Sequence, residues 1–136
     1  MVPHLQSLME HATVQPALNQ CEFHPHLIQK DVRLFCAENN IHFQAYSSLG
    51  TAHHKEKLFA EPVVQELAKK HEVTPAQLLL AWALCQQISV IPKSRNPDHV
   101  RSNLKALSVE LSQDDIDALS SLDKTQHYCW DPNPVV

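Results

Sequence analysis

The sequence VIPKSRNP, at residues 90–97, joins the end of an apolar strand directly to the beginning of a helix. The strand is expected at Ile88–Ile91 and is stopped by the proline that follows it. Asn96 and then Pro97 are typical of an N-cap and the first helical position, and we expect this helix to continue to Leu107. A strand that passes so quickly into a helix is a unit of a parallel α/β sheet.

Strands and helices also alternate along the rest of the chain. Strands are expected at residues 16–23, before a loop at His24 and Pro25, and at residues 41–46. Apolar residues recur at helical spacing in several other segments. The expected helices are residues 5–12, 30–39, 62–71 and 76–84, the last capped by Thr74-Pro75, and a final helix that opens at Ser112 with two acids in its first turn. Residues 47–60 are expected to be loop, and the tail from Lys124 has no periodicity.

This order of elements predicts an α/β fold built from parallel βαβ units. About three strands are expected, whereas a closed parallel barrel takes eight. Three strands are also few for an open sheet with helices on both faces. The pattern therefore suggests a part of a larger architecture.

Composition limits the class of protein. The 136 residues are 43% hydrophobic and 19% charged, and the net charge is −4, so no basic surface indicates nucleic acid. The longest apolar run, at Leu78–Leu84, is far shorter than the roughly 20 residues of a membrane span. No secretory signal is apparent at the N-terminus, and the four cysteines form no CxxC pair. We expect one domain with reduced thiols in the cytoplasm, without a membrane partner.

A single glycine, Gly50, excludes the common glycine-rich nucleotide motifs. A dinucleotide fingerprint of the GxGxxG type and a P-loop both need several glycines. A nucleotide would therefore have to be held in another way.

Polar residues end all three predicted strands. Asn19-Gln20 closes the first, Tyr46-Ser47 the second and Lys93-Ser94 the third. Ligands of parallel α/β proteins gather at the carboxyl ends of the strands. Polar residues end strands in many proteins, so one such pair would be weak evidence, but three in register predict a site.

The third strand end also predicts an anion site. A helix N-terminus presents unpaired N–H groups and a partial positive charge, both of which attract phosphate. Lys93, Ser94 and Arg95 add two cations and a hydroxyl beside that helix start.

Four segments together resemble the aldo-keto reductase family, in its order and approximate spacing. They are NQCEFHP (19–25), AYSSLG (45–50), TPAQLLLAW (74–82) and VIPKS (90–94), and the resemblance covers residues 3–122. It implies a partial (β/α)8 TIM barrel, with about the last three strands and their helices. Residues 1–136 would be a single region, the C-terminal half of an NADP-dependent oxidoreductase barrel, with a C-terminal tail at 123–136.

The resemblance also implies a nicotinamide-nucleotide site. Gln20, with Asn19, would hydrogen-bond the carboxamide, and the nicotinamide would stack on Tyr46. Ser47 and Leu49 would contact the pyrophosphate. The adenosine end would lie at Lys93 and Ser94, which grip the 2′-phosphate. The implied cofactor-binding residues are Asn19, Gln20, Tyr46, Ser47, Leu49, Lys93, Ser94, Asn96, His99 and Asn103.

Two positions near the adenosine end depart from the family pattern. His99 stands where an arginine is usual, and Ser102 stands where a glutamate commonly faces the adenine. Because an imidazole is at most partly charged at pH 7, NADP(H) is the expected cofactor with NAD(H) as the alternative. Arg95 or Arg101 are candidates to compensate.

The family's catalytic aspartate, tyrosine, lysine and histidine all belong to the first half of the barrel, and no residue of this sequence matches them. Tyr46 matches the stacking tyrosine and is not assigned as proton donor. The family reduces aldehydes and ketones to alcohols with NADPH. We expect this chain to be inactive or weakly active alone, with a small carbonyl substrate only where the full barrel is present.

Two other hypotheses remain open from the sequence. The chain could be a non-enzymatic isoform or decay product that acts as a binding or interaction module. It could also be a fragment that regains activity with an N-terminal half.

Other residues have simpler interpretations. Ten histidines, among them the C-x2-H-x-H pattern of Cys21, His24 and His26, lack the second ligand pair of a zinc site, so solvent-facing loop histidines are expected. Trp82 is expected in the core. By resemblance, Tyr128 and Trp130 would line a substrate pocket, with a mobile tail as the alternative.

Overall fold

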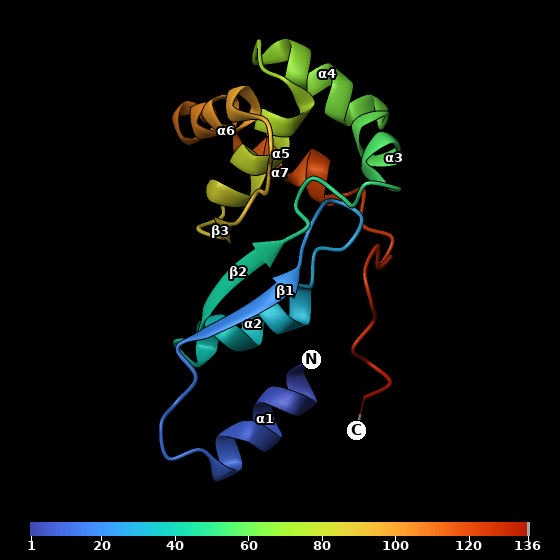
Figure 1. Cartoon of the computed structure of the whole chain (residues 1–136). Coiled ribbons are helices and arrows are strands. Elements are labelled where there is room, and N and C mark those ends of the chain that lie inside the picture. The colour runs from blue at the N-terminus through green and yellow to red at the C-terminus, as the bar shows by residue number, and fades with distance from the viewer. Residues whose placement is uncertain (136) are drawn as a thin grey trace.

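Three short strands, β1 (Leu18–Glu22), β2 (His42–Tyr46) and β3 (Ser89–Val90), form a parallel sheet in chain order (Figure 1). The computed structural model describes residues 1–135. β1 and β2 pair over all five positions, whereas β3 pairs with β2 over only two residues. The α/β class and the number of strands are as predicted, although β3 is shorter than the expected Ile88–Ile91.

Seven α-helices and one 3-10 helix accompany the sheet within residues 1–135. They are α1 (Val2–His11), α2 (Lys30–Glu38), α3 (Lys55–Phe59), α4 (Pro62–Lys70), α5 (Pro75–Leu84), α6 (Pro97–Leu104), η1 (Lys105–Ser108) and α7 (Gln113–Ser120). No helix of these described residues is both long and apolar enough to cross a membrane.

Two predicted elements need correction. Residues 47–60 were expected to be loop, but α3 occupies Lys55–Phe59 within them. A helix of five residues is too short to show a periodic pattern, and it is held by Leu58, which is fully buried. The helix after Asn96 ends as an α-helix at Leu104 and continues as the 3-10 helix η1.

Side-chain caps fix the starts of three helices where the sequence placed them. The Thr74 hydroxyl accepts from the Gln77 N–H at 3.2 Å, and the Gln77 side chain accepts from the Thr74 N–H at 3.0 Å. Asn96 Oδ1 accepts from the Asp98 N–H at 2.8 Å. Ser112 and Asp115 form the same reciprocal box. These bonds satisfy N–H groups that have no partner inside a helix.

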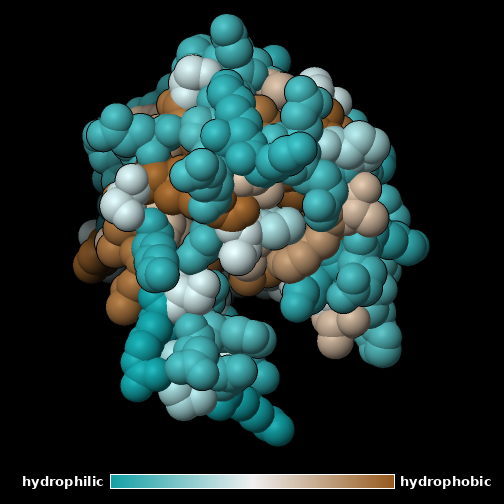
Figure 2. All heavy atoms as spheres, turned by 90° about the horizontal axis from the view of Figure 1, so that it is seen from above, coloured by the Kyte–Doolittle hydropathy of each residue, from teal (hydrophilic) through white to brown (hydrophobic). Residues whose placement is uncertain are grey.

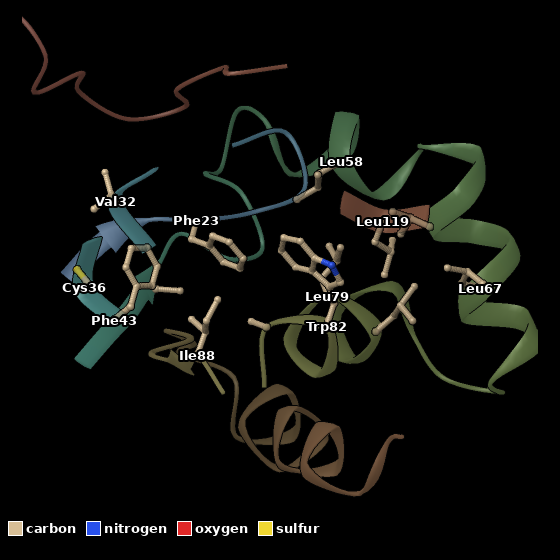
Figure 3. Close-up of a cluster of buried hydrophobic side chains, with 14 of the residues drawn as sticks. Phe23, Val32, Cys36, Phe43, Leu58, Leu67, Leu79, Trp82, Ile88 and Leu119 are labelled. Carbon is tan, nitrogen blue, oxygen red and sulfur yellow. The ribbon is translucent and has the colours of Figure 1, made fainter. Parts of the chain in front are cut away.

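An aromatic stack lies at the centre of the core (Figure 3). The rings of Phe23 and Trp82 lie 4.6 Å apart and nearly parallel, and Phe43 meets Phe23 edge-on at 5.8 Å. The Trp82 indole N–H donates to the Ile116 carbonyl at 3.2 Å, so one side chain of α5 joins the sheet to α7. Trp82 is 1% exposed, which confirms its predicted place in the core.

The two faces of the sheet differ in polarity. Phe43 and Ala45 point from β2 into the core and are buried. On the other face, Gln20 donates to Gln44 at 2.7 Å and His42 bonds Ser89 at 2.8 Å. We call this second side, with the even-numbered residues of β1 and β2, the open face. The side of the molecule seen from above in Figure 2 is mainly hydrophilic, with smaller hydrophobic areas between the polar side chains.

We expect Trp82→Ala to destabilise the fold by about 3–5 kcal/mol, because it removes a buried aromatic ring and its hydrogen bond and leaves a cavity. Trp130 is 69% exposed, so Trp130→Ala is the matched control and should change stability by less than about 0.5 kcal/mol. Urea unfolding followed by far-UV circular dichroism measures both. Equal midpoints for the two variants would contradict the assigned core.

Candidate functional site

The three strands end at one edge of the sheet, but Asn19 and Gln20 lie within β1 and not at its end as the sequence suggested, because the strand continues to Glu22. Glu22 lies opposite Tyr46 in the register, and Ala45 lies opposite Val90, so all three strands end at the same side. Ser47, the next residue after β2, has a φ of 51°, a left-handed conformation that turns the chain sharply out of the strand. Sparsely populated backbone conformations of this kind are concentrated at functional sites.

Two adjoining hollows lie beside these strand ends. One has a volume of about 360 Å³ and the other about 320 Å³. Both are lined by Leu49, Gly50, Ala52 and Lys93, so they form one continuous depression, which we call the groove. The larger hollow is also lined by Thr51, Lys55, Phe59, Thr74, Ala76, Ser94, His99, Ser102 and Asn103.

Six of the ten predicted cofactor residues line the groove. They are Ser47, Leu49, Lys93, Ser94, His99 and Asn103. Residues from the loop after β2, the loop after β3 and helix α6 therefore meet in one place, as their predicted roles require.

Four predicted cofactor residues lie elsewhere. Asn96 caps α6 with its side chain. Gln20 and Tyr46 lie on the open face, because the residues of each strand alternate between the two sides. Asn19 projects to the opposite side of β1, where its amide donates to Cys36 Sγ on α2 at 3.6 Å. The alternation thus separates Asn19 from Gln20.

The groove is lined by cations and hydroxyls. Lys55, Lys93 and His99 line the larger hollow, and no residue that lines it is an aspartate or glutamate. Arg95 and Arg101 are not among its lining residues, and Arg101 pairs with Asp98 at 2.9 Å on the exposed side of α6. Neither arginine therefore lines the larger hollow, where it would have to compensate for the histidine at position 99. The balance of charge favours an anionic ligand.

Tyr46 provides a half-buried ring at the end of β2. Burial raises the pKa of its phenol above the ordinary value, and neighbouring Cys129 and Glu22 act in the same direction. The phenol therefore remains neutral at physiological pH, which suits a ring that offers its face for stacking.

A buried carboxylate fixes the tail to the sheet. Glu22 is 2% exposed, and its Oε1 accepts from the N–H groups of Tyr128 at 2.8 Å and Cys129 at 3.1 Å. His24 donates to the same oxygen and His127 to Oε2, both at 3.1 Å. Burial by itself raises the pKa of Glu22, but these hydrogen bonds outweigh it and lower the pKa to about 2.

The histidines after β1 are buried, which corrects the expectation that they face solvent. His24 is 0% and His26 is 2% exposed. His26 bonds the Tyr128 hydroxyl and Glu61, the latter at 2.6 Å, and burial lowers its pKa. These partners lie far away in the sequence, so spacing alone could not reveal the burial. Within residues 1–135, no group of three or more potential ligands is arranged to hold a metal ion.

The tail is docked on the protein. Tyr128 is 8% exposed, and its ring is stacked between His24 at 4.3 Å and His54 at 4.4 Å. Trp130 is largely exposed, and neither Tyr128 nor Trp130 lines the groove. The tail reaches the groove through Cys129, whose Sγ lies 3.4 Å from Ser47 Oγ.

Sequence reasoning missed Glu22 and Lys55. Glu22 ends an otherwise uncharged strand, and a carboxylate at that position was a signal that a donor would cover it. Lys55 gave no signal, because its segment had been expected to be loop.

Parallel strands, helices packed against the apolar face of the sheet and a hollow at the carboxyl ends of the strands match part of an α/β barrel. The family model for the Aldo/keto reductase family matches residues 2–124, and the chain belongs to this family. This confirms the resemblance found in the sequence.

Similar proteins include a probable NAD(P)H-dependent D-xylose reductase of Emericella nidulans, 37% identical over 95% of this chain and 44% of that protein. An aldo-keto reductase from a Medee basin deep-sea metagenome library is 30% identical, with a TM-score of 0.91 over 98% of this chain and 49% of its own. A Gox0644 variant in complex with NADPH is 32% identical, with a TM-score of 0.89 over 100% and 49%. The chain spans about half the length of these relatives.

We expect acid to weaken the docking of the tail through Glu22. Because its folded pKa of about 2 lies below the ordinary 4.5, its stabilisation is complete above about pH 4.5 and is lost as the pH falls toward 2. That loss is about 3 kcal/mol, since one unit of pKa corresponds to about 1.4 kcal/mol.

Unfolding free energies of the unaltered chain and Glu22→Gln, measured in urea between pH 6 and pH 2, test this. The variant should be less stable at pH 6, and the difference should shrink as the pH falls. Glu66→Gln, on the exposed surface of α4, is the matched control and should keep the unaltered pH dependence. A constant difference between the unaltered chain and Glu22→Gln would rule out this role.

Proposed function

We propose that this chain binds NADP(H) along the groove and the open face, and serves as the cofactor-holding half of an NADPH-dependent carbonyl reductase. The main support is the larger hollow, in which Lys93, Ser94, His99 and Asn103 meet around a space without carboxylates. The NADPH complex of the Gox0644 variant, whose fold matches all of this chain, adds support from a relative.

The adenosine end of the nucleotide occupies the larger hollow in this proposal. The Lys93 ammonium and the Ser94 hydroxyl bind the 2′-phosphate, and the start of α6 lies directly after them in the chain. Asn103 faces the adenine. The Ser102 hydroxyl accepts a hydrogen bond from the Gln77 amide at 2.9 Å. Ser102 therefore forms part of the wall of the hollow and is not assigned as a ligand of the nucleotide.

The pyrophosphate occupies the smaller hollow. Ser47, Ser48 and Leu49 line it together with Lys93. Ser48 is 7% exposed, and its hydroxyl has no hydrogen-bond partner within residues 1–135. A buried hydroxyl without a partner is costly, and a phosphate oxygen in this hollow would satisfy it.

The nicotinamide lies against the open face, between Tyr46 and Gln20. The Tyr46 phenol is neutral and its ring is half-buried, as stacking requires. The Gln20 amide nitrogen is held by Gln44 at 2.7 Å, which orients its carbonyl oxygen to accept from the carboxamide. Bound NADPH supplies a hydride, and Tyr46 and Gln20 set the face from which it leaves.

Carbonyl reduction also needs an acid within hydrogen-bond reach of the substrate oxygen. The sequence offers no match to the family's four catalytic residues, and Tyr46 is occupied in stacking. We therefore propose that these 136 residues alone bind the nucleotide but do not turn over a carbonyl substrate. NADP(H) is favoured over NAD(H) because Lys93 and Ser94 face the 2′-phosphate.

A second candidate is a complementing or interaction module. β1 and β3 form the two edges of the sheet, so each presents one row of backbone groups without a strand partner in the described chain. Such edges are templates for pairing with another chain. A first half-barrel that pairs with both edges would bring the missing catalytic groups to the open face.

Lys93→Ala should raise the Kd for NADPH about tenfold, the effect of losing one charge-assisted contact of about 1.4 kcal/mol. Lys105→Ala removes a charge that is also exposed, from η1 outside the groove, and should leave the Kd within about twofold. Quenching of tryptophan fluorescence and enhancement of NADPH fluorescence measure both. Unchanged affinity in Lys93→Ala would refute the phosphate site.

The purified chain should not oxidise NADPH in the presence of a small aldehyde, as followed by absorbance at the NADPH band. Addition of a first half-barrel from an aldo-keto reductase should restore turnover if the complementing role is correct. Robust turnover by the chain alone would contradict the proposed need for groups from a first half.

A further inference from the structure

We infer that Lys55 is a second phosphate-binding cation, which grips the 2′-phosphate of NADPH together with Lys93 and so favours NADPH over NADH. This inference rests on the proposed nucleotide site and assigns it a residue that no sequence motif indicated. Lys55 and Lys93 line the same hollow but come from separate segments, helix α3 and the loop after β3.

A second permanent cation in the hollow would strengthen its hold on a dianion. A phosphate monoester carries about −1.5 to −2 charges at pH 7. His99, the remaining basic residue of the hollow, has an imidazole and not a permanent cation. Arg101 is paired with Asp98, and Arg95 does not line the hollow. Lys55 is therefore the residue that gives the larger hollow a second full positive charge.

The Lys55 ammonium is held at the wall of the hollow without being neutralised. Its Nζ lies 5.0 Å from the centre of the Phe59 ring, and Phe59 also lines the hollow. A cation over an aromatic face is attracted to the ring but keeps its charge. No ion pair between Lys55 and a carboxylate is formed among residues 1–135.

The single glycine of the chain allows Lys55 to come this close. Gly50 has a φ of 77°, and a Cβ at Gly50 would lie 3.2 Å from both the N and the Cα of Lys55. Any larger residue would therefore be strained in its backbone and crowded against the beginning of α3. The sequence identified Gly50 only by what it excluded, whereas the structure gives it a positive role.

The segment that carries Lys55 is fixed on both sides of it. The Lys55 N–H donates to the Thr51 carbonyl at 2.9 Å, and the Thr51 hydroxyl bonds His54 Nδ1 at 2.8 Å. The His54 ring stacks on Tyr128 of the docked tail, and Leu58 is fully buried. The backbone at Lys55 is thus fixed before a nucleotide arrives, and its exposed side chain is oriented by the Phe59 ring, which lowers the entropic cost of binding.

The test compares Lys55→Ala with Lys57→Ala in the complete chain. Lys57 is on the same short helix, is exposed and does not line the groove, so the two variants lose the same charge from nearly the same place. Fluorescence titrations with NADPH and with NADH give the two Kd values, and far-UV circular dichroism checks that both variants fold. Lys55→Arg keeps the charge and tests for rescue.

We expect Lys55→Ala to raise the Kd for NADPH about tenfold and the Kd for NADH less than about twofold. Lys57→Ala should change neither by more than about twofold, and Lys55→Arg should keep NADPH affinity close to that of the unaltered chain. Equal effects of the two alanine variants on NADPH would overturn the inference. Equal losses for NADPH and NADH would also overturn it, because Lys55 would then face a group that both nucleotides share.

The titrations distinguish failure of the nucleotide site from failure of the role of Lys55. If the unaltered chain binds NADPH and Lys55→Ala behaves like Lys57→Ala, the proposed nucleotide site stands and the role of Lys55 is wrong. If the unaltered chain does not bind NADPH at all, the proposed function and the role of Lys55 are both wrong.

Discussion

The buried carboxylate of Glu22 joins the first strand to residues 127–129 of the tail. It accepts two backbone N–H groups of the tail and two histidine N–H groups, and so converts a costly buried charge into a junction of four hydrogen bonds. Once the tail is docked, Tyr128 covers His24 and His54, and Cys129 reaches Ser47. Residues 128 and 129 of the tail therefore pack against the loop after β2, which lines the groove.

The groove is formed by rigid helices together with a loop of unusual backbone conformation. The helix layer is rigid, because Thr74, Asn96 and Ser112 cap their helices and the Phe23–Trp82 stack ties α5 to the sheet. The loop after β2 is shaped by the left-handed conformations of Ser47 and Gly50. Rigid elements that carry specially shaped loops are the usual way in which α/β proteins hold a ligand at the carboxyl ends of their strands.

The open face carries more polar side chains than the interior of a typical closed barrel. The interior of such barrels is dominated by bulky branched residues, whereas Gln20, Gln44, His42 and Ser89 here bond one another across the strands. These pairs satisfy polar groups on a face that no helix covers in the described chain. The same face places Gln20 and Tyr46 on one side, where a flat aromatic ligand can reach both.

The sequence alone determined the class of fold, the three strands and the capped helix starts, because periodicity and capping are local properties. The family resemblance indicated Lys93, Ser94, His99 and Asn103, which the structure brings together at one hollow, and their role in binding a cofactor stays a prediction. Only the tertiary structure decided that His24 and His26 are buried, that the tail is docked and that Lys55 lines the groove. Each of these depends on residues far apart in the chain, such as Glu22 and Tyr128 or Lys55 and Lys93, and such proximity leaves no periodic trace in the sequence.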